Sequence, residues 1–401
     1  MECAYFDAGR CRSCSLLPVP YPRQVADKQD RCRELLAAHP DIVWLDPVRG
    51  DGRAGQDPGP GAERDFRNKA KLVIGGSVQE PTLGILDPDR LGVDLRDCGI
   101  QSPGIRAVIP VIGEFLTLTG LAPYDVPAKR GEVKFVHVTE APSGELMLRF
   151  VVRSQRALRR IRELLDDLVR LVPLVTVVSV NLLPEHRAVL EGEHEELLLG
   201  ESLDMDLGEV SLHLRPQSFF QTNTAVARAL YAQASEWVGA VEPGSLWDLY
   251  CGVGGFALHC ARAAGGGDRG VLGVETSEAA VESARRSAAE AGIDARFIAA
   301  DATEFALGAV GRGETLPELL IVNPPRRGIG PELAAGAVDG DEGAEWLDAS
   351  GVGHVIYSSC NPESLAADLA RMPQYAVREA RLFDMFPHTR HLEVAVRLER
   401  R

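Results

Sequence analysis

A regular alternation of short apolar runs and helical stretches begins at Ser245 and limits the folds open to this chain more than any other feature. The apolar runs are SLWDLY, GVLGVE, ARFIAA, ELLIVN and HVIYSS. Short apolar runs that alternate with helices predict an α/β fold with a doubly wound, mainly parallel sheet. Two more β-type runs, YAVREARLFDMF and LEVAVRLER, follow with no helix between them. We therefore expect a C-terminal antiparallel hairpin added to this sheet.

The rest of the chain predicts two further regions. A cysteine-rich segment, a helical pattern over about residues 25–38 and a Gly-, Pro- and Asp-rich linker from Arg49 to Arg64 come first. A stretch of β-type runs with one helix near Arg156–Leu171 follows, which predicts a central α+β domain. A helix over about residues 224–238 then leads into the parallel sheet. The three predicted domains are residues 1–60, 61–205 and 206–401.

Composition and charge exclude some classes of protein. The 401 residues are 45% hydrophobic with a formal net charge of −15, which is ordinary for a globular enzyme and unlike a nonspecific nucleic-acid-coating protein. Two basic clusters, Arg64–Lys71 and Arg153–Arg160, are either solvated faces or an RNA footprint. No run approaches the ~20 apolar residues of a membrane helix. The first fifteen residues lack the apolar stretch of a signal peptide. We expect a cytoplasmic protein without a membrane segment.

The cysteines are distributed unevenly. Cys3, Cys11 and Cys14 are spaced as C-x7-C-x2-C, and Cys98 lies alone in the polar segment DLRDCGIQSP. Three close thiolates and one distant partner suit a four-coordinate sulfur site, which holds either zinc or an iron–sulfur cluster. Spacing alone does not choose between these metals. Three further cysteines, Cys32, Cys251 and Cys260, are expected to be ordinary small residues of the core.

The ends of the first three apolar runs carry cofactor-binding signals. Gly252, Gly254 and Gly255 lie between the first predicted strand and its helix, where glycines let the backbone approach a nucleotide-like ligand. Glu275 ends the second strand, twenty residues after Gly255, and is placed to accept hydrogen bonds from ribose hydroxyls. Asp301 ends the third. Acidic strand ends and a glycine loop without lysine favour S-adenosylmethionine, which is cationic and has no phosphate, over a dinucleotide.

The last two parallel strands end in residues with reactive side chains. The fourth ends in Asn323-Pro-Pro followed by Arg326, where an amine methyltransferase would need an aromatic residue. The fifth ends in Cys360, before a predicted helix N-cap at Asn361, and a helix dipole there should lower the thiol pKa and favour a nucleophilic thiolate. Glu393 opens the last strand and is a candidate general base. A thiolate that adds to C6 of uracil makes C5 nucleophilic toward a sulfonium methyl, and a base must then remove the C5 proton.

Seven motifs together resemble a known family: MECAYFDAGRCRSC, DFRNKAK, RPQSFFQTN, DLYCGVGGF, VNPPRRGIG, SSCN and LFDMFPHTRHLE. The chain is similar to the bacterial 23S rRNA (uracil-5-)-methyltransferases, in particular to the short type whose cluster cysteines begin at the N-terminus. The resemblance implies a Rossmann-like class I methyltransferase sheet, S-adenosylmethionine as cofactor and 23S rRNA as partner. It also implies an N-terminal iron–sulfur segment whose [4Fe-4S] cluster is bound by Cys3, Cys11, Cys14 and Cys98.

The resemblance also assigns site residues. It implies Cys360 as nucleophile and Glu393 as proton acceptor, with Gln221, Tyr250, Glu275 and Asn323 at the S-adenosylmethionine site. Tyr250 stands where the family has Phe and keeps the ring. We expect the protein to lack the N-terminal barrel of longer relatives, and recognition therefore to rest on the central domain and the cluster segment.

Two alternatives stay open at this point. One is a tRNA uridine-5 methyltransferase, because the same catalytic residues suit either RNA. The other is a non-catalytic iron–sulfur protein that binds RNA, which would have no need of Cys360 or Glu393. The sequence indicates no obligate protein partner. It does not determine the methylated uridine, the oligomeric state or whether the cluster is redox-active.

Overall fold

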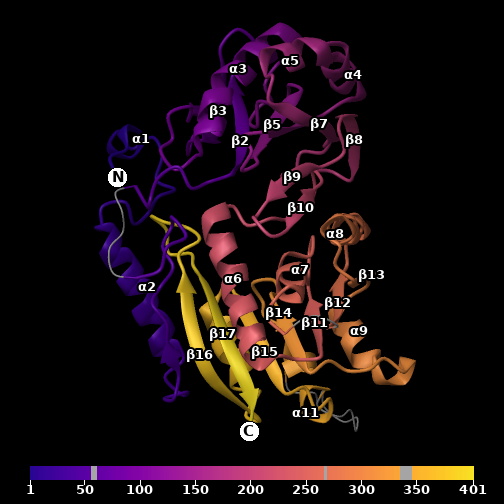
Figure 1. Cartoon of the computed structure of the whole chain (residues 1–401). Coiled ribbons are helices and arrows are strands. Elements are labelled where there is room, and N and C mark those ends of the chain that lie inside the picture. Colours follow the sequence, from indigo (N-terminus) through magenta and orange to yellow (C-terminus); the bar gives the residue numbers. More distant parts are fainter. Residues whose placement is uncertain (56–60, 266–268, 335–345) are drawn as a thin grey trace. The chain divides into compact units, whose positions relative to one another are not determined.

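The computed structural model describes residues 1–55, 61–265, 269–334 and 346–401 (Figure 1). Residues 56–60 of the predicted linker lie outside this description. Within the described ranges, no helix is long and apolar enough to cross a membrane.

Two compact units make up the chain. Unit 1 combines Met1–Ser15 with Glu63–Asp206, and unit 2 combines Leu16–Ala62 with Leu207–Arg401. The predicted boundaries near residues 61 and 206 fall where the chain changes unit. The predicted N-terminal segment of residues 1–60 is instead divided between the units, because its helix packs into the hydrophobic core of unit 2.

Unit 2 is built on an eight-stranded sheet in the order β1-β16-β17-β15-β14-β11-β12-β13. Five neighbouring strands, β15, β14, β11, β12 and β13, are mutually parallel. In contrast, β17 is antiparallel to both β15 and β16. This confirms the predicted parallel sheet with a C-terminal hairpin. The edge strand β1, which is parallel to β16, is not predicted by the sequence pattern. The strands are β1 (Val43–Trp44), β11 (Ser245–Leu249), β12 (Gly270–Glu275), β13 (Arg296–Ala299), β14 (Leu319–Val322), β15 (His354–Ser359), β16 (Tyr375–Phe383) and β17 (Glu393–Arg400), with a short β10 (Ser211–Leu214) outside the sheet.

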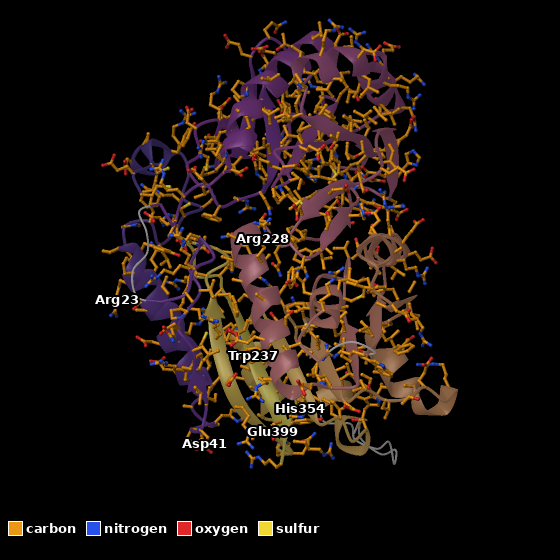
Figure 2. The ribbon with its side chains drawn as sticks, in the orientation of Figure 1. Arg23, Asp41, Arg228, Trp237, His354 and Glu399 are labelled. Carbon is orange, nitrogen blue, oxygen red and sulfur yellow. The ribbon has the colours of Figure 1, made fainter. Side chains whose placement is uncertain are left out.

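Helices and alternate strand residues form the core of unit 2. Trp247 and Leu249 of β11 share a buried cluster with side chains of α2, α9 and α12. The first of these helices begins at Tyr21, earlier than predicted, with a proline in its first turn. On α6, Trp237 is labelled in Figure 2 and is 2% exposed. The helices are α2 (Tyr21–Leu35), α6 (Thr224–Val241), α7 (Gly255–Ala261), α8 (Glu278–Ala291), α9 (Ala302–Gly308), α10 (Pro331–Ala334), α11 (Trp346–Ala349) and α12 (Pro362–Leu369), with a 3₁₀ turn at Val310–Arg312.

Unit 1 contains a seven-stranded sheet in the order β4-β3-β2-β5-β6-β7-β8. All its pairs are antiparallel except β6 with β7, which the helices α4 and α5 connect. The helices α3, α4 and α5 contribute to one core on a single face of this sheet (Figure 1). The elements are α1 (Ala4–Asp7), β2 (Lys69–Gly76), β3 (Pro81–Leu86), β4 (Gly92–Asp94), α3 (Pro103–Thr119), β5 (Val133–Glu140), β6 (Leu146–Val152), α4 (Gln155–Glu163), α5 (Leu165–Leu171), β7 (Val175–Leu182), β8 (His194–Leu199) and β9 (Leu203–Asp206).

The helix predicted near Arg156–Leu171 is two helices. The chain leaves helical geometry at Leu164, where φ is −106° and ψ is 16°. Ile161 on the first helix and Leu168 on the second are both buried in the core of the unit. The predicted basic cluster in this region includes Arg160. Its side chain donates hydrogen bonds to carbonyls at the C-terminus of α3, so part of the cluster is used within the unit.

Candidate active site

The carboxyl ends of the parallel strands in unit 2 meet at one edge, as the strand order requires. After β11, Tyr250, Gly252 and Gly254 have φ values of +67°, +54° and +86°. The left-handed region is natural for glycine but costly for tyrosine, so this turn holds strain at the predicted cofactor site. The Gly252 N–H donates to Glu275 Oε2 at 3.1 Å, which ties the turn to the end of β12. The predicted glycine turn and acidic strand end therefore lie together.

The next strand end places an acidic side chain at the start of a helix. Asp301 is the N-cap of α9, where its Oδ1 accepts a hydrogen bond from the Glu304 N–H at 3.0 Å. The Tyr250 hydroxyl lies 3.1 Å from Thr303 Oγ1, and the charge of Asp301 contributes to the raised pKa of Tyr250, after burial as the main cause. Asn323 is half-buried directly after β14. Gln221 is buried in a different segment, just before α6.

Asp248 is a residue of this edge that sequence reasoning missed. It is fully buried within β11, where its Oδ2 accepts a hydrogen bond from the Ala257 N–H of α7 at 3.0 Å. Burial raises its pKa to about 8, and the nearby charge of Glu275 adds to the effect. A carboxyl group inside an otherwise apolar strand, four residues before a glycine turn, was the available signal.

Cys360 lies directly after β15, at the end opposite His354, which is labelled in Figure 2. Asn361 is the N-cap of α12 and accepts from the Glu363 N–H, with proline in the first turn, as predicted. The Asn361 side chain also donates to the Arg326 carbonyl at 3.0 Å, so this cap joins the loops after β14 and β15.

Glu393 reaches the same edge because β17 is antiparallel to β15. Its strand begins where β15 ends, with Ser359 opposite Val394 in the register. Glu393 is 2% exposed, and burial raises its pKa to about 7. Ser358 donates a hydrogen bond to Glu393 Oε1, which stabilises the charged carboxylate and limits the rise. A buried carboxyl group with a pKa near neutrality is suited to accept a proton.

The predicted lowering of the Cys360 pKa is wrong. Burial raises this pKa, and the negative charge of Glu393 raises it further. The guanidinium of Arg326 opposes both effects but does not outweigh them. The helix dipole acts on Cys360 from the adjacent residues, whereas Glu393 reaches it from another strand.

Cys360 opens onto a cavity of about 710 Å³ within unit 2. Arg326 and Arg390, both exposed, line this cavity, and Arg326 Nη2 lies 3.0 Å from His391 Nδ1. Arg31 also lines it and forms an ion pair with Glu363. Four cationic side chains line this cavity against two acidic ones, Asp27 and Glu363, in a chain whose net charge is −15.

Helix α2 holds the loop that leads into Glu393. Lys28 Nζ lies 2.5 Å from Asp384 Oδ1, and both side chains are buried. Gln24 accepts from the His388 N–H at 2.8 Å, and its Nε2 lies 3.2 Å from His388 Nδ1. Sequence reasoning missed these roles of Lys28 and Gln24. The only signal was the dense polar motif LFDMFPHTRHLE, which gives no partner for its Asp.

The predicted cluster cysteines all belong to unit 1. The Tyr5 hydroxyl accepts a hydrogen bond from the Asp97 N–H at 3.2 Å, which holds the N-terminal segment beside Cys98. Burial raises the pKa of Cys14 to about 12, and the next largest causes are the thiols of Cys98, Cys11 and Cys3. The four thiols are thus electrostatic neighbours. Among the described residues, however, no three His, Cys, Asp or Glu side chains are arranged as a metal site.

Comparisons with known proteins agree with this geometry. A family model described as tRNA (Uracil-5-)-methyltransferase matches residues 187–401. The chain is 45% identical to 23S rRNA (uracil(747)-C(5))-methyltransferase RlmC of Yersinia pseudotuberculosis over 397 residues, 98% of each chain. It is 44% identical to the Yersinia enterocolitica RlmC at the same coverage.

A solved structure is also similar. The Pyrococcus abyssi tRNA (uracil-54, C5)-methyltransferase, in complex with S-adenosyl-L-homocysteine, superposes with a TM-score of 0.76 and 25% identity. The match covers 97% of this chain and 84% of that one. The chain therefore belongs to the (uracil-5-)-methyltransferase family.

Proposed function

We propose that this protein transfers a methyl group from S-adenosylmethionine to C5 of a uridine in 23S rRNA. The observation that carries the proposal is the placement of Cys360 on a cation-lined cavity with the buried carboxyl group of Glu393 as its electrostatic neighbour. The full-length similarity to RlmC supports 23S rRNA as the substrate, and the names of those relatives make uridine 747 the first position to examine.

The reaction that these residues support has three steps: addition of Cys360 to the base, methylation of C5, and elimination of Cys360. The Cys360 thiolate adds to C6 of uracil, and the electron pair of the C5–C6 double bond moves to C5. Arg326 favours that thiolate, because its guanidinium opposes the rise in the thiol pKa that burial and Glu393 cause. After C5 has gained the methyl group, Glu393 accepts the C5 proton. The electrons of that C–H bond re-form the double bond, and the sulfur leaves C6 as a thiolate.

The cofactor site is proposed at the glycine turn. S-adenosylmethionine supplies an electrophilic methyl group there. The open space beside Gly252, where an added Cβ would meet no atom within 4 Å, fits a ligand against the backbone. Glu275 and Asp301 provide carboxylates that suit ribose hydroxyls and a cationic ligand. Tyr250 belongs to the same proposed site. The remaining proposed ligand-binding residues are Gln221 and Asn323.

A [4Fe-4S] cluster on Cys3, Cys11, Cys14 and Cys98 is the second part of the proposal. The donor set fits, because four free thiols belong to one unit, and those of Cys98, Cys11 and Cys3 lie close enough to Cys14 to raise its pKa. Such a cluster would join the N-terminus to the turn at Cys98, and we assign it a structural role.

The alternative substrate is a tRNA, and two observations support it. The matching family model and the archaeal structure are both described as tRNA enzymes. A non-catalytic role has less support, because it gives no reason for Glu393 to be buried beside Cys360.

The test compares the two RNAs directly. Unmethylated 23S rRNA and tRNA transcripts are incubated with the anaerobically purified protein and S-adenosylmethionine carrying a tritiated methyl group. We expect label in 23S rRNA alone, at a uridine mapped by mass spectrometry of nuclease fragments, and none with Cys360→Ala. Label in tRNA alone would establish the alternative, and label in neither would refute both.

A further inference from the structure

Unit 1 has a cavity of its own, with a volume of about 310 Å³. Its floor is apolar and comes from three strands, with Val73 on β2, Leu86 on β3 and Phe135 on β5. Val73 and Phe135 are direct partners in the sheet register. They alternate with the core residues Leu72 and Val136, so the cavity lies on the face opposite the helices. The Phe135 ring is only half-buried.

The charged side chains that line this cavity are cationic. Arg90, Lys134 and Arg187 line it, whereas no Asp or Glu of the described residues does. Lys134 Nζ lies 4.7 Å from the centroid of the Tyr124 ring and donates to a backbone carbonyl. Arg90 and Arg187 are exposed, and within the described part of the chain their guanidiniums form no ion pair. Two such guanidiniums above an apolar floor suit a ligand that is both anionic and flat.

We propose that this cavity is an RNA subsite that takes one unpaired nucleobase of the substrate against Phe135, while Arg90 and Arg187 contact the adjacent phosphates. Proteins recognise single-stranded RNA by stacking bases on aromatic rings beside basic side chains. A cavity of this size is at the lower limit for small-molecule sites and holds one base. The inference rests on the proposed function, since it requires an RNA substrate.

The two halves of the subsite have different signatures in binding to an unmethylated 23S rRNA transcript. Phe135→Ala removes a stacking surface, so we expect roughly tenfold weaker binding with an unchanged salt dependence. The Arg90→Ala, Arg187→Ala double variant removes phosphate-binding cations, so the slope of log K against log salt should fall by about 0.7 for each phosphate that is no longer neutralised. KM for the transcript should rise in both variants while kcat stays at the wild-type value.

Arg170→Ala is the matched control, because Arg170 is a 73% exposed arginine of the same unit that lies on α5. It should bind the transcript as the wild type does. The double arginine variant changes only exposed side chains, so it decides the question even if Phe135→Ala does not fold. A double variant with wild-type affinity and salt slope would overturn the subsite. The proposed function would still stand if the wild-type enzyme methylates the transcript. A wild type that binds the transcript but methylates no RNA would overturn the proposed function alone, and one that does not bind would overturn both.

Discussion

Cys360 in unit 2 and Cys14 in unit 1 are both half-buried thiols with a raised pKa, and burial is the main cause for each. Their charged neighbours differ in kind. The groups that next raise the pKa of Cys14 are three other thiols, whereas for Cys360 the next group is the carboxylate of Glu393. Each also has one arginine that lowers its pKa, Arg67 for Cys14 and Arg326 for Cys360.

The different neighbours explain how one type of side chain acquires two roles. Cys14, whose pKa is raised by three neighbouring thiols, becomes a thiolate when the four thiols bind a metal that takes up their charge. A single thiol between a guanidinium and a buried carboxyl group has a partner that favours the thiolate and a partner that can hold a proton. We therefore assign metal binding to the first set and nucleophilic attack to the second, and the predictions below test that assignment.

Cys360→Ala should have the most severe consequence. Without the sulfur, uracil C5 is not activated, so methylation and any covalent RNA adduct should both disappear while the metal content stays that of the wild type. Tritium incorporation, a denaturing gel and an iron assay measure these three properties. Cys260→Ala, which removes a buried thiol of α7, should behave as the wild type. Residual methylation by Cys360→Ala would exclude this cysteine as the nucleophile.

Glu393→Gln should stop the reaction at a later step. Cys360 can still add to C6 and C5 can still gain a methyl group, but the C5 proton has no acceptor and the sulfur cannot leave. A protein–RNA adduct that carries the extra methyl group should therefore accumulate, visible as a shifted band on a denaturing gel and by its mass. Turnover at the wild-type rate without an adduct would show that another group, such as His391 or water, takes the proton.

Cys98→Ser should affect unit 1 and leave the catalytic residues unchanged. If the four thiols bind a cluster, the anaerobically purified wild type should be brown with about four iron atoms per chain, and the variant should lose most of that iron. We expect RNA binding to weaken more than cofactor binding, because the cluster segment belongs to the unit with the central sheet. Zinc without iron in the wild type would contradict the iron–sulfur assignment.

The sheet edge could be predicted from sequence because it depends on local patterns. Apolar runs that alternate with helices determine where each parallel strand ends, and thus that Glu275 and Cys360 lie at strand ends on one side of the sheet. The antiparallel hairpin similarly brings Glu393 to that edge. Each step uses residues that are close in the chain.

The interactions that the sequence did not predict join distant segments. Lys28 and Asp384, whose ion pair holds the loop before Glu393, are 356 positions apart, and neither residue specifies its partner. The division of residues 1–60 between two units has the same origin, since α2 is placed by its core contacts. The pKa of Cys360 was mispredicted because burial and Glu393 are tertiary effects.

Ser358→Ala should have the mildest consequence. It tests the role of the Glu393 carboxylate through the pH dependence of the reaction. With a pKa of about 7, Glu393 is protonated in mild acid and unable to accept the C5 proton, so resolution of the adduct should accelerate as pH rises through that value. Ser358 donates to the carboxylate and thereby lowers this pKa. Removing a hydrogen bond to a charged group should raise the pKa by roughly one unit. The variant should therefore resolve its adduct more slowly near neutral pH and as fast as the wild type in alkaline buffer.

Rapid-quench measurement of adduct decay across pH provides the profile. Ser359→Ala is the matched control, because the neighbouring Ser359 hydroxyl donates to the Asn361 carbonyl at 3.0 Å and not to Glu393. Its profile should overlay that of the wild type. An equal shift in both serine variants would point to a general disturbance of β15, and no shift in Ser358→Ala would mean that the titrating group is not Glu393. A shift confined to Ser358→Ala requires that proton removal passes through the Glu393 carboxylate, since no other titratable group accepts that hydroxyl among the described residues.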